Sequence, residues 1–174
     1  MPSPSPRKNL LPGSLKRHVS YWRELETVAD LAVLLRVPQH QLQLLSLQPR
    51  YKTYEIPKRD GSKRLIEDPA PALKAVQRKI NHYLQASYFF IRPPVVHGFC
   101  IRPRHTEARN ILSNARVHLG QPHLLNMDLE DFFHFVTAEK VDAIFRDHFP
   151  RMRPELIETL TRLSTRWQRL PMGA

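Results

Sequence analysis

The sequence has 174 residues, enough for one domain with a hydrophobic core, and its 27 lysines and arginines exceed its 16 acids, giving a formal charge of +11. That excess favours a polyanionic partner such as nucleic acid, although a solvated basic surface without a partner would have the same composition. One cysteine excludes an intramolecular disulfide, and the absence of a signal peptide and of any apolar stretch of about 20 residues fits a cytoplasmic protein with no membrane partner.

The first 50 residues predict a tail followed by a helical region. Residues 1–13 are rich in proline, serine and basic side chains, and we expect a flexible tail that is disordered or loosely attached. Short helices are predicted over 18–26, from a capping box at Thr27 to Val37, and over 39–47. The last two could form a DNA-binding helix-turn-helix, but the second is rich in glutamine and leucine rather than basic, which favours a packing role.

A cationic β-hairpin is predicted next. Residues 51–57 suit a strand, Asp60-Gly61 is typical of a two-residue turn, and residues 64–67 return as the second strand. Positioned cations on such a hairpin can bind a triphosphate, whereas lysines on an exposed edge strand can also serve only to prevent aggregation. The residues alone leave both interpretations open for the four cations, Lys58, Arg59, Lys63 and Arg64.

A long amphipathic helix is expected from residues 69–71 to about Phe90, with Lys74, Arg78 and Lys79 on its polar face. These cations could contact a nucleic-acid backbone or simply be solvated. Beyond two prolines that break the chain, a loop and a helix beginning near Thr106 carry three further arginines, Arg102, Arg104 and Arg109.

The stretch from Leu124 to Phe133 has the most specific chemistry. The apolar run from Leu124 to Met127 predicts a buried strand that ends on Asp128, and Asp131 follows three residues later. A carboxylate at the end of a buried strand is costly unless a cation such as Mg²⁺ pairs it. Acids in the first turn of a helix would give the same spacing, so the residues alone favour neither interpretation.

Two helices are expected to follow. Thr137 is predicted to cap a helix that runs to about His148. Pro154 suits the first position of the last helix, whose apolar face is expected to extend through Trp167 to Leu170. The inward residues predicted for the first of these helices are Val141, Ile144 and Phe145.

Asn126-x-Asp128-Leu129-x-Asp131-Phe132-Phe133 resembles the first palm motif of reverse transcriptases, especially the bacterial retron type. Residues 54–66 resemble the fingers hairpin of that family, Leu73-Lys74-x-x-Gln77-x-x-Ile80 the helix that follows, and Val96-His97-Gly98-Phe99 a retron-type element. The resemblance covers roughly residues 25–174. It implies an α+β fold, helix-rich with a small antiparallel hairpin, in which an N-terminal helical region (14–50) precedes right-hand polymerase fingers (51–120) and an incomplete palm (121–174).

The resemblance also implies site residues for nucleotidyl transfer with two Mg²⁺ ions. Asp128 would be the catalytic, first metal-binding aspartate, and Leu129 could offer its backbone carbonyl to the second ion. Phe133 matches the bulky residue under the sugar, whereas Phe132 is preferred as core. The implied nucleotide-binding residues are Lys58, Lys63, Arg64, Asp131, Phe132, Phe133 and Met172, and the implied template contacts are Lys74, Arg78, Arg102, Arg104 and Arg109.

Two departures from the family pattern shape the functional expectation. The Tyr-x-Asp-Asp hairpin and the thumb are absent from this sequence, and Met172 stands where Gln is usual. We therefore expect a fragment or split-enzyme half of a retron-like RNA-directed DNA polymerase, inactive alone, acting on an RNA template, an RNA/DNA duplex and dNTP once another segment supplies the missing parts. The alternative is a non-catalytic nucleic-acid-binding or interaction module. An unfinished apolar edge and an uncovered last helix would favour the polymerase, and a well-covered core would favour the module.

Overall fold

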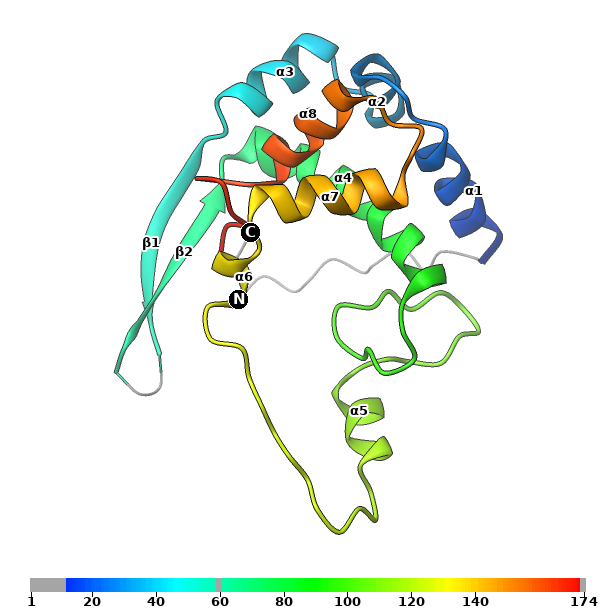
Figure 1. The fold of residues 1–174 in the computed structure, drawn as a ribbon, viewed down its shortest axis with the longest axis vertical. Coiled ribbons are helices and arrows are strands. Elements are labelled where there is room, and N and C mark those ends of the chain that lie inside the picture. Colours follow the sequence, from blue (N-terminus) through cyan, green and yellow to red (C-terminus); the bar gives the residue numbers. More distant parts are fainter. Residues whose placement is uncertain (1–11, 59–60, 173–174) are drawn as a thin grey trace. The chain divides into compact units, whose positions relative to one another are not determined.

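The computed structural model describes residues 12–58 and 61–172, and the chain divides into two compact units. The first unit comprises Met1–Trp22 and His82–Met127, and the second comprises Arg23–Asn81 and Asp128–Ala174. Both contain helices, while the antiparallel hairpin belongs to the second (Figure 1). Within the described ranges, every helix is too short or too polar to cross a bilayer.

The first unit is built on α1 (Pro12–Arg23) and the C-terminal half of α4 (Pro71–Ile91). Leu15 and Val19 of α1 bury their side chains with Ala86 of α4. The helix predicted over 18–26 therefore starts six residues earlier, at a proline suited to a first helical turn, and ends at Arg23. Of the tail predicted to be disordered, residues 1–11 lie outside the described residues.

The helix expected near Thr106 in the first unit begins instead at Ile111, as α5 (Ile111–Val117). Asn110 caps it: the Asn110 side chain accepts from the Ser113 N–H at 3.0 Å, and the Ser113 hydroxyl accepts from the Asn110 N–H at 2.7 Å. Because an N-cap residue has extended rather than helical backbone, the helix cannot start before it.

In the second unit α8 (Pro154–Ser164) packs against α2 (Val28–Leu35), α3 (Gln39–Leu47) and α7 (Ala138–His148) (Figure 1). Leu156, Leu160 and Leu163 of α8 have no exposed surface, so this helix is covered, contrary to the expectation for a polymerase fragment. Leu42 of α3 is equally buried, which supports the packing role assigned to that helix.

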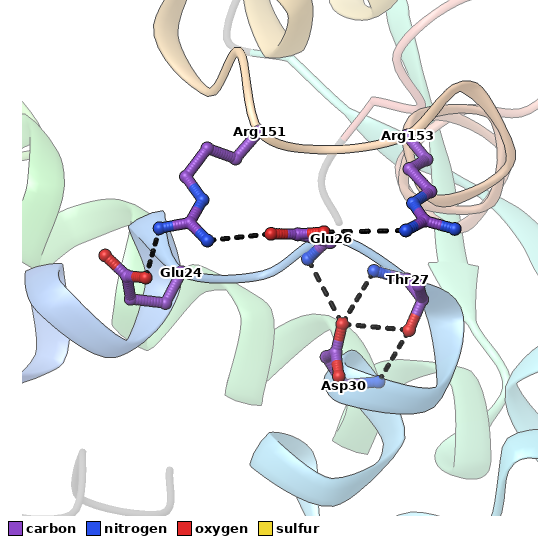
Figure 2. Close-up of polar contacts among 6 residues, drawn as sticks. All are labelled: Glu24, Glu26, Thr27, Asp30, Arg151 and Arg153. Carbon is purple, nitrogen blue, oxygen red and sulfur yellow. Dashed lines mark hydrogen bonds and ion pairs between the residues drawn. The ribbon is translucent and has the colours of Figure 1, made fainter.

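Polar contacts fix the ends of these helices. Thr27 caps α2 in the predicted capping box with Asp30, and the Arg151 guanidinium, in the α7–α8 connection, pairs with Glu24 and Glu26 (Figure 2). The Arg153 N–H also donates to the Glu26 carbonyl at 2.9 Å. The α1–α2 and α7–α8 connections are thereby joined, although such exposed ion pairs add little stability each.

Two details of the C-terminal helices differ from the prediction. Ile144 was expected to point inward but is 53% exposed. The last helix ends at Ser164, so its apolar face does not reach Trp167 or Leu170. Instead, Arg166 and Arg169 pair across a tight turn, which removes Trp167 from the helix.

The hairpin pairs β1 (Tyr51–Pro57) with β2 (Lys63–Pro69), with Tyr51 opposite Pro69 and Pro57 opposite Lys63. β1 ends at Pro57 and β2 begins at Lys63, so the connection between the strands is longer than the predicted two-residue turn. The Lys58 N–H donates to the Ser62 carbonyl at 2.7 Å. Gly61 adopts a φ of 84°, as the sequence suggested, while Asp60 lies outside the described residues.

The buried strand predicted from Leu124 to Met127 is wrong: this segment is irregular, and Leu125 and Met127 are 78% and 80% exposed. A strand needs a neighbouring strand to pair its backbone groups. In the described parts of the chain, β1 and β2 pair only with each other. The apolar run therefore has no sheet to join.

Candidate functional site

Glu67, on β2, is the centre of a buried polar cluster in the second unit. Its side chain is 0% exposed, and its carboxylate accepts hydrogen bonds from Arg166 at 3.1 Å, Arg169 at 2.7 Å and the Met172 backbone N–H at 3.0 Å. The Glu67 N–H in turn donates to the Met172 carbonyl at 2.9 Å. Because a buried charge is tolerated only when it is paired and hydrogen-bonded, these contacts are what allow Glu67 to lie there.

The pKa of Glu67 lies below its usual value despite its burial. Burial is the largest single influence and raises the pKa, but the hydrogen bonds from Arg169 and Met172, together with the charges of Arg169 and Arg166, outweigh it. Glu67 is therefore a carboxylate at neutral pH. We call Glu67, Arg166, Arg169 and Met172 the Glu67 cluster.

The Glu67 cluster also connects the hairpin to α7. Thr137, the cap of α7, forms a backbone bridge with Arg169, and the Ala138 N–H donates to the Gln168 carbonyl at 2.8 Å. The Leu170 N–H donates to the Val136 carbonyl at 2.9 Å. Residues 166–172 thus join β2 to the start of α7, which lies ten residues beyond Asp128 in the sequence.

Asp128 itself is exposed and bonds locally: its Oδ1 accepts from the Leu129 N–H at 2.9 Å. Asp131 precedes the short helix α6 (Phe132–Phe135) with a left-handed φ of 49°. Phe132 and Phe133 contact each other edge to face, with ring centroids 5.7 Å apart. Phe132 is 50% exposed, so its assignment to the core is wrong.

Magnesium binding can be tested against the donors that are present. In the described ranges, no three histidine, cysteine or acidic side chains come together as a metal site would require. Asp128 offers a single carboxylate, whereas Mg²⁺ is usually held by several oxygen ligands in octahedral geometry. These residues do not by themselves fit a two-magnesium centre.

The cations predicted to bind nucleotide or template differ in their surroundings. On the hairpin, Lys63 pairs with Glu55 at 2.8 Å, and both are largely exposed. On α4, Lys74 pairs with Asp68. The remaining predicted cations of the second unit have exposed side chains: Lys58, Arg64 and Arg78.

The three predicted arginines of the first unit also differ in their surroundings. The Arg109 guanidinium donates to the carbonyls of Pro93, Pro94 and Val96 at 2.8–3.0 Å, which makes it a support of its own loop. Arg102 and Arg104 are exposed. Arg109 therefore has a structural role within its own loop that was not predicted from the sequence.

Glu67, Arg166 and Arg169 were not among the site residues predicted from the sequence. The available signal was weak: an acid at the inward register of a half-buried strand, and two arginines three residues apart near the end of the sequence. Their sequence separation from Glu67, about 100 residues, hides the pairing.

No family model matches this chain. It is 33% identical over 158 residues to the Retron Ec86 reverse transcriptase of Escherichia coli, a match that covers 86% of this chain and 45% of that protein. It is 34% identical over 146 residues to the Retron Mx65 reverse transcriptase of Myxococcus xanthus, a match that covers 79% of this chain and 32% of that protein. It is 41% identical over 99 residues to the Retron Mx162 reverse transcriptase of the same organism, a match that covers 55% of this chain and 18% of that protein. The matched part is less than half the length of each of these relatives.

Proposed function

Because this chain is similar to retron reverse transcriptases over most of its length, we propose that it forms the fingers and the first part of the palm of a retron-like RNA-directed DNA polymerase. This similarity is the observation that carries the proposal. In this arrangement the hairpin and α4 belong to the fingers (51–120), and the segment from residue 121 onward is an incomplete palm.

The Glu67 cluster supports this arrangement. It ties the base of a cationic hairpin to the segment that contains Met172, and through Thr137, nine residues beyond Asp128 in the sequence, to the start of α7. Lys58 and Arg64 are the exposed hairpin cations that would contact the triphosphate of dNTP. In the same proposal Asp131, Phe132 and Phe133 border the nucleotide, with Lys63 a secondary contact because it is paired with Glu55.

Asp128 would contribute one carboxylate, and Leu129 a backbone carbonyl, to a magnesium site completed by another segment that carries Tyr-x-Asp-Asp. That segment would come from a second chain or from further sequence, along with the thumb. Apolar side chains that flank Asp128 in the sequence support the need for a covering segment, because each is 67–80% exposed: Leu124, Leu125, Met127, Leu129 and Phe135. This chain alone should be inactive.

The RNA template and the RNA/DNA duplex would meet exposed basic side chains. Arg78, Arg102 and Arg104 are the stronger candidates because their side chains are exposed. Lys74 and Arg109 are weaker candidates because Asp68 and three backbone carbonyls already occupy them.

The test is primed RNA-templated DNA synthesis with Mg²⁺, first by this chain alone and then with a segment that supplies Tyr-x-Asp-Asp and the thumb. Synthesis is expected only in the complemented mixture, and Asp128→Asn should abolish it. Glu130→Gln is the matched control, because it removes one exposed acidic charge two residues away. Absence of synthesis despite confirmed assembly, or equal losses in the two variants, would contradict the proposal.

A second candidate is a non-catalytic nucleic-acid-binding or interaction module. The fully buried leucines of α8 favour it, since they show that the helical part of the second unit has a covered core. Under this candidate the chain alone would bind nucleic acid, and complementation would add no synthesis.

A further inference from the structure

The turn that connects Arg166 to Arg169 has a backbone that its residue types disfavour. The Arg166 N–H donates to the Arg169 carbonyl at 2.8 Å and the Arg169 N–H to the Arg166 carbonyl at 3.1 Å. Between them Trp167 and Gln168 have φ values of 49° and 62°, in a left-handed region that large side chains rarely occupy. Such strained positions persist only where the surrounding structure imposes them, and they concentrate at functional sites.

The surroundings hold this turn from two directions. The Ala138 N–H donates to the Gln168 carbonyl at 2.8 Å, and both flanking arginines bond the buried carboxylate of Glu67. The backbone of the turn is therefore hydrogen-bonded at its base, while the Trp167 side chain is 65% exposed. The other tryptophan of the chain, Trp22, is 0% exposed, so Trp167 is the tryptophan whose indole ring is exposed to solvent.

The charge around Trp167 is positive. The Arg166 guanidinium carbon lies 3.7 Å from the Trp167 ring centroid, and that of Arg169 lies 5.6 Å away. One carboxylate faces two guanidiniums, which leaves a net charge of +1 beside the exposed ring. The two arginine side chains retain 14% and 19% exposure, so an anion can reach their edges.

A fixed, exposed aromatic ring beside cations suits one kind of partner in particular. Single-stranded nucleic acid offers flat bases that stack on aromatic side chains and phosphates that pair with arginine. A duplex hides its base faces, and an anionic surface without bases offers only the charge. We propose that Trp167 is a stacking platform for an unpaired base of single-stranded nucleic acid, with Arg166 and Arg169 beside the adjoining phosphate.

This inference depends on the proposed function for its biological role, because it names a contact for the nucleic acid that a polymerase would require. Binding by this chain is measured without synthesis, so the two proposals fail separately. Loss of synthesis in the Asp128→Asn test says nothing about Trp167, and unchanged binding of single strands says nothing about Asp128.

The first measurement is intrinsic fluorescence of the unaltered chain titrated with unpaired oligonucleotides of about 15 nucleotides, RNA and DNA in separate arms. Because Trp22 is buried, quenching by a stacked base should come from Trp167 and should disappear in Trp167→Phe. A base-free polyanion such as heparin should quench much less at equal charge. Equal quenching by heparin, or none by single strands, would overturn the proposal.

The second measurement is the dissociation constant from fluorescence anisotropy at fixed salt, since affinity for a polyanion is meaningful only at stated ionic strength. Trp167→Ala should weaken single-strand binding on the order of tenfold, while Trp167→Phe should retain most of it. A blunt duplex of the same sequence should bind both variants like the unaltered chain. Tyr21→Ala is the control, because Tyr21 is also a half-exposed aromatic residue. Unchanged single-strand binding by Trp167→Ala would overturn the proposal and favour a protein segment as the partner of Trp167.

Discussion

The Glu67 cluster and Asp128 lie in the same unit, yet they are stabilised in opposite ways. Glu67 is fully buried and its carboxylate is bonded by groups about 100 residues away, at Arg166, Arg169 and Met172. Asp128 is exposed, and its described hydrogen bond is to the next residue, Leu129. The first arrangement is set by long-range contacts within this chain, whereas the second has little that fixes its geometry.

This difference indicates what the chain can organise by itself. A metal site needs carboxylates held in a defined geometry, which requires supporting contacts around the ligands. Among the residues that the structure describes, such contacts occur at the base of the hairpin, whereas the hydrogen bond that Asp128 accepts is local, from the Leu129 N–H. We therefore predict that a substitution at Glu67 lowers stability strongly and one at Asp128 only slightly. For complemented DNA synthesis we predict the larger effect at Asp128.

The largest expected effect is on the free energy of unfolding when Glu67 is changed to Gln. The substitution keeps the shape but leaves two partly buried guanidiniums without their shared carboxylate. Breaking a buried ion pair by removing one partner typically costs about 3–5 kcal/mol, and we expect a loss in that range. Chemical denaturation followed by circular dichroism measures it.

Glu55→Gln is the matched control for this prediction. Glu55 lies on the partner strand and also pairs with a cation, Lys63, but the pair is exposed. An exposed ion pair contributes less than about 1 kcal/mol. Similar losses for the two variants would show that burial of Glu67 does not govern its contribution.

A smaller effect is expected on how stability depends on pH. The folded pKa of Glu67 lies below its unfolded value of 4.5, so the unfolded state binds more protons between the two values. The contribution of Glu67 is fully present above about pH 4.5 and is lost as the pH falls through the folded pKa. Thermal unfolding followed between pH 7 and pH 3 should therefore show a shallower acid dependence for Glu67→Gln than for the unaltered chain.

Glu26 and Asp30 act in the same direction and contribute to the acid dependence that remains. The hydrogen bond from Arg151 lowers the pKa of Glu26, and the hydrogen bond from Thr27 lowers that of Asp30. Both contributions survive in Glu67→Gln. An identical pH dependence in the variant and the unaltered chain would contradict a lowered pKa for Glu67.

Local patterns predicted much of the fold, and contacts between distant residues account for most of what was missed. The capping box at Thr27, the hairpin strands and the long helix α4 follow from short-range chemistry that each segment carries within itself. The strand expected at Leu124 failed because a strand depends on a neighbour, which no local pattern can supply.

The residues of the candidate site also differ in whether a local sequence pattern could predict them. Asp128 and the hairpin cations are recognisable because the family motif is contiguous in sequence. The pairing of Glu67 with Arg166 and Arg169 joins positions that have no shared local pattern, and the turn at Trp167 occupies residues where a continuing helix was expected. Neither follows from periodicity, because the apolar spacing of α8 continues past the point where the backbone leaves the helix.

The smallest expected effect on stability is that of Asp128→Asn. Asp128 is exposed, and asparagine can still accept a hydrogen bond from the Leu129 N–H, so the free energy of unfolding should change by no more than about 0.5 kcal/mol. Denaturation of the isolated variant beside Glu67→Gln measures this contrast directly. A loss of several kcal/mol would mean that Asp128 supports the fold of this unit, and the abolition of complemented synthesis by the same substitution could then no longer be assigned to a missing metal ligand. A small loss together with abolished synthesis would separate the two roles, because the segment would then matter only when another segment completes the site around it.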